Sequence, residues 1–381
     1  MKKIAVLGAG LVGSLMAREL AADGRFEVTA FDRDERALGA LGRLPRLATR
    51  RADLSSPGEV ARAAAEADVV VGAVPGVLGH QVLKTVLEAR RPLADISFAP
   101  EDPLLLDPLA KANGVAAIVD CGVSPGLSNL AVGRAEALFE STDAIRILVG
   151  GLPFRRVKPF EYRSVFSPTD VIEEYTRPAR IREQGRTVVK PALSEPEEVE
   201  LPVVGTLEAF NTDGLRTLLV TSRAANVCEK TLRYPGHAAL MRAFRDSGFF
   251  GEAPIEAAGV RIAPRAVTEA LLFAAWTRPP EDDEFTVLRV TCRGKRAGRA
   301  EVRTYDLFDR TDPRTRTTSM ARTTGFPCIL AAGMLAEGTW REPGVFPPEV
   351  LGRRADLWDG MVAGLAARGV TFRESVAVEP G

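Results

Sequence analysis

Three glycines near the N-terminus stand at a spacing that can hold a phosphate. The segment KIAVLGAGLVG runs from an apolar stretch into Gly8, Gly10 and Gly13, and a pattern of helical period follows. Gly8 permits a tight turn, Gly10 leaves room for a pyrophosphate, and Gly13 lets the helix lie close to the strand. Backbone N–H groups at the helix start, at Leu11 and Val12, face the anion. The segment predicts a dinucleotide site, although such glycines can also form a plain strand–helix turn.

A carboxylate follows at the end of the next apolar stretch. Asp32 comes nineteen positions after Gly13, where the adenosine ribose of a dinucleotide would lie. A carboxylate there accepts hydrogen bonds from the ribose hydroxyls and repels a 2′-phosphate, which favours NAD over NADP. Arg33 leaves NADP open as a second cofactor, because its guanidinium could pair with a 2′-phosphate.

Apolar runs and helical patterns alternate over the first 122 residues. The runs are continuous rather than alternating, as is typical of parallel strands covered on both faces. We expect strands at Ile4–Leu7, Phe26–Phe31, Leu47–Ala48, Val69–Val74, Ala94–Ser97 and Ala116–Val119. Helices are expected at Val12–Ala22, Gly58–Ala65, Leu78–Ala89 and Pro103–Asn113. This order predicts an α/β Rossmann domain with a doubly wound parallel sheet over residues 1–122.

The fourth expected strand ends in Val74 and Pro75, which are followed by a glycine. In an open α/β sheet the carboxyl ends of the strands face the cofactor crevice. We therefore expect Val74 and Pro75 on the nicotinamide side of that crevice, with an ordinary Pro-Gly turn as the alternative.

The pattern changes after Gly122. Alternating stretches predict strands with one wet face at Phe160–Phe166, Glu198–Val204, Phe285–Val290 and Glu301–Leu307. Residues 123–324 are thus expected to form an α+β substrate domain. We interpret the Pro-, Arg- and Glu-rich residues 176–202 as a long surface excursion. Helical spacing returns at Gly325–Ala336 and Glu349–Arg368.

The composition excludes several classes of protein. The 381 residues carry 50 basic and 50 acidic side chains, so no net field would attract nucleic acid or an anionic membrane. The four cysteines contain no CxxC pair, which argues against a zinc site and a disulfide framework, so we expect no metal and a reducing compartment. We find no apolar run of membrane-spanning length and no signal-peptide pattern. A cytoplasmic protein with a small-molecule substrate is the resulting expectation.

Several segments resemble the saccharopine dehydrogenase-like family, and its lysine 6-dehydrogenase branch most closely. The segment DCGVSPGLSN at 120–129 is similar to the one that follows the Rossmann half in that family. Further matches are GGLP at 150–153, EYTRPA at 174–179, EAFNTDGLR at 208–216, TLRYPGH at 231–237, GFF at 248–250 and TGF at 324–326. These motifs cover nearly the whole chain in the family's order.

The resemblance implies a function and an assembly. It implies NAD-dependent oxidative deamination of the ε-amino group of L-lysine to the 6-semialdehyde, which cyclises, with release of ammonia. It also implies that residues 325–381 return to pack on the Rossmann domain, and that the protein is a homodimer or homotetramer.

That reaction makes two demands on the site. Hydride can leave only from a neutral amine, so the site needs a proton acceptor near pH 7, and it must hold the distant α-carboxylate. His237 stands at the expected start of a helix that runs to Phe250. A helix N-terminus disfavours imidazolium, which would keep His237 neutral and able to act as the base. A histidine that is only hydrogen-bonded near a helix start is the alternative; His80, in a Rossmann helix pattern, is not selected.

Charged residues of the matched motifs are candidates to hold the substrate. Arg177, Arg216 and Arg233 could each bind its carboxylate through the guanidinium fork, or be plain surface charge. Glu174 and Asp213 could receive its α-ammonium, although Asp213 precedes a glycine and can equally cap a turn.

Three further residues are candidates beside the reacting nitrogen. Asp120, at the end of the last Rossmann strand, could orient the histidine or receive the ammonium. Tyr175 and Tyr234 could donate a hydrogen bond to the nitrogen, or be core aromatics.

Two other functions remain open from the sequence. One is a saccharopine reductase or a related enzyme acting on a secondary amine of amino acids or polyamines. The other is a protein that binds the nucleotide without turnover.

Overall fold

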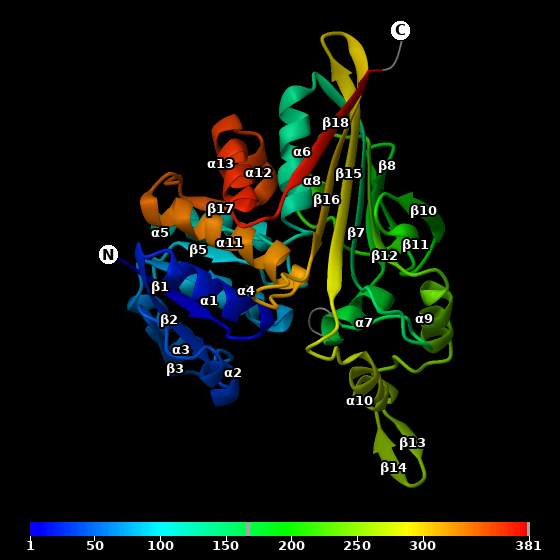
Figure 1. Cartoon of the computed structure of the whole chain (residues 1–381), viewed down its shortest axis with the longest axis horizontal. Coiled ribbons are helices and arrows are strands. Elements are labelled where there is room, and N and C mark those ends of the chain that lie inside the picture. Colours follow the sequence, from blue (N-terminus) through cyan, green and yellow to red (C-terminus); the bar gives the residue numbers. More distant parts are fainter. Residues whose placement is uncertain (165–167, 379–381) are drawn as a thin grey trace. The chain divides into compact units, whose positions relative to one another are not determined.

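The computed structural model describes residues 1–164 and 168–378. The chain divides into two compact units, whose elements are labelled in Figure 1. The first unit comprises Met1–Leu138 and Ala321–Thr371, and the second comprises Phe139–Met320 and Phe372–Gly381.

The first unit is built on a seven-stranded parallel sheet with the order β17-β6-β5-β4-β1-β2-β3. Its strands are β1 (Lys2–Leu7), β2 (Phe26–Asp32), β3 (Leu47–Arg51), β4 (Val69–Gly72), β5 (Leu93–Asp95), β6 (Ala116–Ile118) and β17 (Gly344–Phe346). The apolar run Val69–Val71 is buried in the middle of the sheet, as expected for a strand covered on both faces. The predicted doubly wound α/β fold is confirmed, and β17 is an additional strand supplied by the C-terminal part of the chain.

Ten helical segments belong to this unit, α11 except for its first two residues. They are α1 (Leu11–Ala22), α2 (Glu35–Ala40), α3 (Pro57–Ala65), α4 (Gly76–Glu88), the 3₁₀ turn η1 (Pro103–Leu106), α5 (Asp107–Asn113), α6 (Leu127–Leu138), α11 (Ser319–Glu337), α12 (Pro348–Gly352) and α13 (Ala355–Ala366). A side chain at Gly133 of α6 would collide with the backbone of α12, and one at Gly352 of α12 with the backbone of α6. α6 and α12 therefore pack closely within the first unit, which extends to Leu138.

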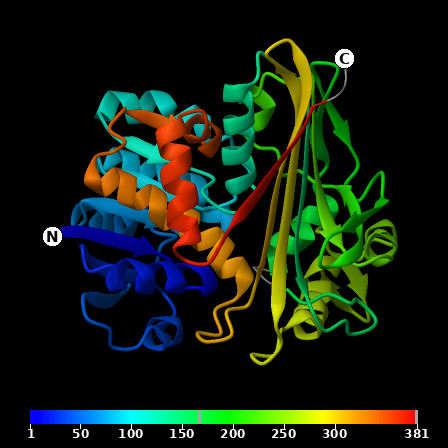
Figure 2. The ribbon, with the colours of Figure 1, turned by 45° about the horizontal axis from the view of Figure 1, so that its top comes forward.

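The second unit is built on a nine-stranded sheet that is mostly antiparallel. Its main path is β10-β11-β12-β7-β15-β16-β18, with β8 paired to β12 and β9 paired to β8. The strands are β7 (Ser141–Pro153), β8 (Ala179–Glu183), β9 (Arg186–Lys190), β10 (Glu197–Leu201), β11 (Gly205–Asn211), β12 (Asn226–Arg233), β15 (Glu284–Arg296), β16 (Arg299–Arg310) and β18 (Phe372–Val378). Figure 2 shows β18, in red, lying along the long strand β16.

The helices of the second unit cover one face of this sheet. They are α7 (Pro168–Thr176), α8 (Leu218–Thr221), α9 (His237–Asp246) and α10 (Pro264–Trp276), and a separate hairpin is formed by β13 (Ile255–Ala257) and β14 (Val260–Ile262). Tyr175 of α7, Met241 of α9 and Trp276 of α10 share one apolar core with Phe210 of β11. The two tyrosines of this core, Tyr162 and Tyr175, are both buried.

Three expectations about elements are corrected. Residues 176–202 are not a simple surface excursion, because β8 and β9 form a hairpin that pairs with β12, and β10 pairs with β11. Residues 160–164 form no strand, since Phe160 and Tyr162 instead pack their rings against Trp276; the rest of the expected Phe160–Phe166 strand lies outside the described residues. The last strand, β18, pairs with β16 and so belongs to the second unit.

Candidate functional site

The glycine-rich loop joins β1 to α1. Gly8 has a φ of 107°, in the region that favours glycine, and a side chain there would meet the backbone of Ala73. A side chain at Gly13 would meet the carbonyl of Gly8, whereas nothing lies within 4 Å of the position where a side chain at Gly10 would begin. The first N–H groups of α1, which begins at Leu11 and continues with Val12, have no partner within the helix. Open space at Gly10 beside such N–H groups is what a bound pyrophosphate requires.

The carboxylate of Asp32 accepts hydrogen bonds from two backbone N–H groups. One oxygen of its carboxylate accepts a 2.7 Å hydrogen bond from the N–H of Ala9, and the other accepts one of 2.9 Å from Asp34. The acid at the end of β2 therefore holds the glycine-rich loop in place. The next residue, Arg33, is exposed. Val74 is buried and Pro75 is the residue before α4, so both lie in the turn after β4, which ends at Gly72 and not at Val74 as expected.

A row of buried polar side chains follows one face of β12. Glu229, Thr231 and Arg233 alternate with Lys230 and Leu232, so the first three lie on the same face of the strand. Arg233 is only 2% exposed. Phe210, on the neighbouring strand β11, is paired with Thr231. Because Phe210 belongs to the core beneath α7, α9 and α10, the polar row faces those helices.

Arg233 connects the row to two side chains of α7. Its guanidinium donates a 2.6 Å hydrogen bond to Glu174, whose side chain is 24% exposed. Its charge also acts on Tyr175, where it lowers the pKa of the phenol against the effect of burial. Burial raises the pKa of Glu174, and the charge of Arg233 acts in the opposite direction. Burial likewise raises the pKa of Tyr175 to about 12, so the phenol keeps its proton near neutral pH.

His237 completes this chain of contacts. Its Nε2 lies 2.9 Å from the Tyr175 hydroxyl and its Nδ1 lies 3.1 Å from the carbonyl oxygen of Phe160. A carbonyl can only accept, so Nδ1 carries the proton and Nε2 accepts a hydrogen bond from Tyr175. Burial and the charge of Arg233 lower the pKa of His237 to about 3, against the hydrogen bond to Phe160.

The histidine therefore stays neutral, as the sequence led us to expect, but for a different main reason. Burial dominates rather than the helix N-terminus. The helix start itself carries a carboxylate, because Glu208 accepts a 2.9 Å hydrogen bond from the N–H of Ala238. Gly236, which precedes α9, provides no side-chain cap, so Glu208 supplies one from β11.

Three buried donor groups around this cluster have no acceptor among the described residues. They are the Nε of Arg233, the hydroxyl of Tyr162 and the indole nitrogen of Trp276. The ring of Tyr162 lies 5.3 Å from that of His237 and 5.4 Å from that of Trp276, and the Arg233 guanidinium lies over it at 4.6 Å. Buried donors are nearly always hydrogen-bonded in folded proteins. Three such donors therefore lie within this one cluster.

Glu229 adds a second buried carboxyl to the same face of β12. It accepts a 2.8 Å hydrogen bond from Thr212, whose hydroxyl lies 2.8 Å from that of Thr231. Gly214 is placed so close that a side chain there would collide with the carboxyl. Burial raises the pKa of Glu229 to about 8, opposed by Thr212 and reinforced by the charges of Glu174 and Asp213. This carboxyl is therefore mainly protonated at neutral pH.

The other predicted substrate-binding residues have different surroundings. The guanidinium of Arg180 donates two hydrogen bonds of 2.9 and 2.8 Å to Asp213. The carboxylate of Asp213 is therefore already paired with an arginine. Arg177 forms a 3.5 Å ion pair with Glu173 of the same helix. Arg216 is buried just before α8 and has a φ of 51°.

Tyr234 and Asp120, which were predicted beside the reacting nitrogen, have the following surroundings. Tyr234 donates a 2.9 Å hydrogen bond to the carbonyl of Pro153 and belongs to the core on the other face of the sheet. Asp120 belongs to the first unit, where it is buried after β6 with a φ of 54°.

The sequence analysis missed Tyr162, Trp276 and Glu229. For Glu229 a signal was present, because an acid, a threonine and an arginine alternate in a strand that is otherwise buried. No such signal marks Tyr162 or Trp276, which reach the cluster from an irregular segment and from the last position of α10.

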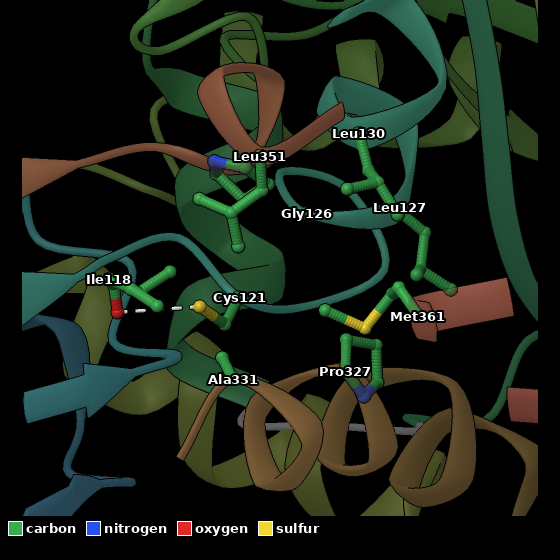
Figure 3. Close-up of a pocket in the computed structure, with 10 residues that line it drawn as sticks. Ile118, Cys121, Gly126, Leu127, Leu130, Pro327, Ala331, Leu351 and Met361 are labelled. Carbon is green, nitrogen blue, oxygen red and sulfur yellow. Dashed lines mark hydrogen bonds between the residues drawn. The ribbon is translucent and has the colours of Figure 1, made fainter. Parts of the chain in front are cut away.

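A small apolar pocket lies in the first unit, between α6, α11, α12 and α13 (Figure 3). Leu127, Leu130, Pro327, Leu351 and Met361 are among its walls, with the thiol of Cys121 beside them. The thiol contacts the carbonyl of Ile118. A pocket without charged side chains offers nothing to a charged amino acid. In residues 1–164 and 168–378 no set of three side chains is arranged to bind a metal, and no helix could span a membrane.

Comparison with known proteins assigns the chain to a family. Residues 4–118 match the saccharopine dehydrogenase NADP binding domain, and residues 122–370 match the saccharopine dehydrogenase C-terminal domain. The chain belongs to the saccharopine dehydrogenase family. Residues 4–118 of the first unit are accordingly a nicotinamide-dinucleotide-binding domain.

The family's solved structures share the fold. Apo saccharopine dehydrogenase (L-Glu forming) from Saccharomyces cerevisiae superposes with a TM-score of 0.81 over 99% of this chain and 100% of that one, at 19% identity. Two curated relatives match less of their own length. Alpha-aminoadipic semialdehyde synthase of Arabidopsis thaliana is 23% identical over 52% of this chain and 20% of its own. Carboxynorspermidine synthase of Vibrio cholerae is 26% identical over 63% of this chain and 59% of its own.

Proposed function

We propose that this protein is an NAD-dependent lysine 6-dehydrogenase, which oxidises the ε-amine of L-lysine and releases ammonia. The observation that carries the proposal is the group of three buried donors without acceptors beside the neutral pair Tyr175 and His237. A carboxylate supplies the missing acceptors, and a primary amine is the group on which a phenol and an imidazole can act.

The two ends of lysine would contact different parts of the cluster. We assign the carboxylate to the free donors of Arg233, Tyr162 and Trp276, and the reacting amine to the neighbourhood of Glu174 and Tyr175. The carboxylate of Glu174 attracts the amine in its protonated form.

Proton transfer would then run through Tyr175 to His237. The amine must lose a proton before oxidation, and the Tyr175 hydroxyl is already hydrogen-bonded to Nε2 of His237. The charge of Arg233 is one cause of the low pKa of His237. A substrate carboxylate beside Arg233 would offset that charge and raise the pKa of His237, so the base becomes stronger when the substrate is bound.

The glycine-rich loop would hold the cofactor. Backbone N–H groups at the start of α1 bind its pyrophosphate, and Asp32 favours NAD over NADP because a carboxylate repels a 2′-phosphate. When bound, NAD supplies the acceptor for the hydride that leaves the carbon bearing the amine.

Comparison of substrates tests this proposal. The purified protein is mixed with NAD or NADP and separately with lysine, ornithine, saccharopine, glutamate or a carboxylated polyamine, and reduced cofactor and ammonia are measured. We expect turnover with lysine and NAD, with one ammonia released for each reduced cofactor. Turnover with saccharopine or a carboxylated polyamine and none with lysine would contradict the proposal, as would binding of the cofactor without turnover of any amine.

A further inference from the structure

The α-ammonium group of a bound lysine needs hydrogen-bond acceptors of its own. The free donors of Arg233, Tyr162 and Trp276 suit a carboxylate and not a cation. The carboxylate of Glu174 already accepts a hydrogen bond from Arg233, and we assign it to the reacting amine at the other end of the substrate. An ammonium group carries three donors and is costly to bury without acceptors.

Two buried polar side chains of β15 have such acceptors. Glu284 and Thr286 are the first and third residues of that strand, and both are 0% exposed. One carboxylate oxygen of Glu284, Oε1, accepts a 2.9 Å hydrogen bond from the N–H of Met320. The other, Oε2, and the hydroxyl of Thr286 have no hydrogen-bond partner among the described residues. Because buried polar atoms nearly always have partners, these two atoms require an explanation.

Both side chains lie on the face of the sheet that carries Arg233. Phe285, which stands between them in the strand, belongs to the apolar core on the other face, and Leu232 belongs to the same core. Side chains alternate between the two faces along a strand, so Glu284 and Thr286 point to the same side as Arg233. The unpaired acceptors of β15 and the free donors around Arg233 therefore share one face.

Only the strand β7 separates β15 from β12 in the sheet (Figure 1). Thr286 is paired with Gly151 of β7. On the other side of β7, the parallel register that pairs Thr231 with Val149 leads on to Arg233 opposite Gly151. Neighbouring strands are about 4.8 Å apart, and Gly151 has no side chain. No side chain of β7 therefore stands between Thr286 and Arg233.

Glu284 is also close to Tyr162, whose hydroxyl we assign to the substrate carboxylate. The chain leaves α10 at Trp276 and enters β15 at Glu284 after residues 277–283, and the ring of Trp276 lies 5.4 Å from that of Tyr162. Burial is the main cause of the raised pKa of Tyr162, and the charge of Glu284 adds to it. The carboxyl group is thus near enough to act on this hydroxyl.

The described surroundings of Glu284 do not supply a full counter-charge. Burial raises the pKa of Glu284 to about 7, although the hydrogen bond from Met320 and the charge of Arg278 act in the opposite direction. Asp309, which is paired with Thr286 across β15 and β16, adds to the rise. A cation that comes close to such a carboxyl stabilises its ionised form.

We propose that Glu284 and Thr286 bind the α-ammonium group of the substrate. This assignment rests on the proposed function, in which the carboxylate of the same amino acid binds beside Arg233. Donors for the anion and acceptors for the cation then form one site for an amino-acid zwitterion. Glu284 determines specificity in this site, because a ligand without the α-ammonium group leaves its buried oxygen unpaired. The ligand 6-aminohexanoate is such a molecule, since it is lysine without the α-amino group.

Calorimetric titration of the full chain in the presence of NADH tests the proposal. The ligands are lysine, saccharopine and 6-aminohexanoate. We expect the natural protein to bind lysine or saccharopine at least about a hundredfold more tightly than 6-aminohexanoate, because a charged hydrogen bond is lost in the last. Glu284→Gln keeps an oxygen for the N–H of Met320. It should weaken binding of the α-amino acid by at least about tenfold and change binding of 6-aminohexanoate by less than about twofold.

Thr286→Val is a second variant, with a side chain of similar shape. It removes only a hydroxyl without a partner, so we expect an equal or higher melting temperature and binding of the α-amino acid that is weaker by about threefold or more. Thr142→Val is the matched control. Thr142 is buried near the opposite end of β7 from Gly151, and its hydroxyl also lacks a partner among the described residues. The control should bind lysine as the natural protein does.

Binding and turnover together separate this proposal from the proposed function. An α-amino acid that binds tightly and is weakened by Glu284→Gln and Thr286→Val, without oxidation of lysine, would support the ammonium site and contradict the lysine 6-dehydrogenase. Oxidation of lysine together with equal affinity for lysine and 6-aminohexanoate would overturn the ammonium site alone. Variants that bind lysine as tightly as the natural protein would also overturn it. Binding of none of the three ligands would overturn both proposals.

Discussion

At the scale of single residues, two unpaired polar groups of the second unit lie beside the residues to which we assign the chemistry. The hydroxyl of Tyr162 and the indole nitrogen of Trp276 are buried and lack acceptors among the described residues. Each such group costs about 1–3 kcal/mol relative to a hydrogen-bonded one. The ring of Tyr162 lies beside Arg233 and His237. The unpaired groups therefore reduce the stability of the fold where we propose that the substrate binds.

Tyr162→Phe separates this role from a structural one. The substitution removes only the unpaired hydroxyl, so we expect a melting temperature that is equal or higher and a KM for lysine that is raised about tenfold, because a hydrogen bond to the carboxylate is lost. Tyr234→Phe is the matched control, since its hydroxyl donates to Pro153 on the other face of the sheet. The control should melt lower and keep its KM; the reverse pattern would mean that Tyr162 does not contact the substrate.

Tyr175→Phe tests the proton path. The phenol keeps its proton near neutral pH because burial raises its pKa to about 12, and it is the group that joins the reacting amine to His237 in our proposal. We expect kcat with lysine to fall by about a hundredfold or more, with little change in the affinity for NADH. Stopped-flow and steady-state kinetics would measure both. An unchanged kcat would remove Tyr175 and His237 from the chemistry.

Glu229→Gln tests the buried carboxyl by its pH dependence. The pKa of Glu229 is raised to about 8 from 4.5, so the folded protein holds a proton that the unfolded chain releases. Its contribution to stability is complete below pH 4.5 and is lost as the pH rises through about 8. Compared with the glutamine variant, the natural protein should lose up to about 1.4 kcal/mol per pH unit across that window. Urea unfolding measures the difference, and a difference independent of pH would show that the carboxyl is ionised in the fold.

At the scale of elements, substitutions of two glycines in the turn between β1 and α1 distinguish an effect on folding from an effect on cofactor binding. A methyl group at Gly13 would collide with the carbonyl of Gly8, whereas one at Gly10 meets nothing within 4 Å. Gly13→Ala should therefore lower the melting temperature strongly. Gly10→Ala should melt near the natural protein but bind NADH at least about tenfold more weakly, because its methyl group occupies the place of the pyrophosphate.

Gly39→Ala is the control for that comparison, since Gly39 in α2 also has open space and is remote from the loop in sequence. Intrinsic fluorescence titration with NADH and thermal melting give the two readouts. Equal NADH affinity for Gly10→Ala and Gly39→Ala would contradict the placement of the cofactor.

The elements of the first unit could be predicted because each has a local cause. Five of the six N-terminal strands, all except β3, contain short apolar runs, and each helix expected in residues 1–122 lies within a few residues of an observed one. The pairing of β17 with β6 could not be predicted, because β17 lies more than 200 residues further along the chain and only three residues pair. Likewise, the strand expected at Phe160–Phe166 failed because burial of Phe160 and Tyr162 around Trp276 overrides their preference for strands.

The candidate site was predictable only where a motif carried it. His237, Tyr175, Glu174 and Arg233 lie in the motifs EYTRPA and TLRYPGH, and the structure hydrogen-bonds Tyr175 to His237 and Arg233 to Glu174. Asp213 lies in an equally recognisable motif but is held by Arg180. A motif in the sequence indicates where in the fold a residue lies. It does not indicate whether the charge of that residue is already paired with a neighbour, because such pairs form between strands that are distant in sequence.

At the scale of the whole molecule, two kinds of sheet serve two tasks. The parallel sheet of the first unit presents strand ends and the N-terminus of α1 to a dinucleotide, and the mainly antiparallel sheet of the second unit presents the polar row of β12. The C-terminal part of the chain contributes to both, because β17 completes the first sheet and β18 the second. This division explains why the match to the family's C-terminal domain runs from residue 122 to residue 370 and so includes elements of both units.

Lysine deuterated at both hydrogens of its ε-carbon gives the most direct test of the central claim. The account predicts that one deuterium from each lysine appears at C4 of the nicotinamide ring, measured by proton NMR of the reduced cofactor, with a slower reaction than for ordinary lysine. Reduced cofactor that carries no deuterium, formed at the same rate, would show that the hydride comes from another carbon and would contradict the assignment.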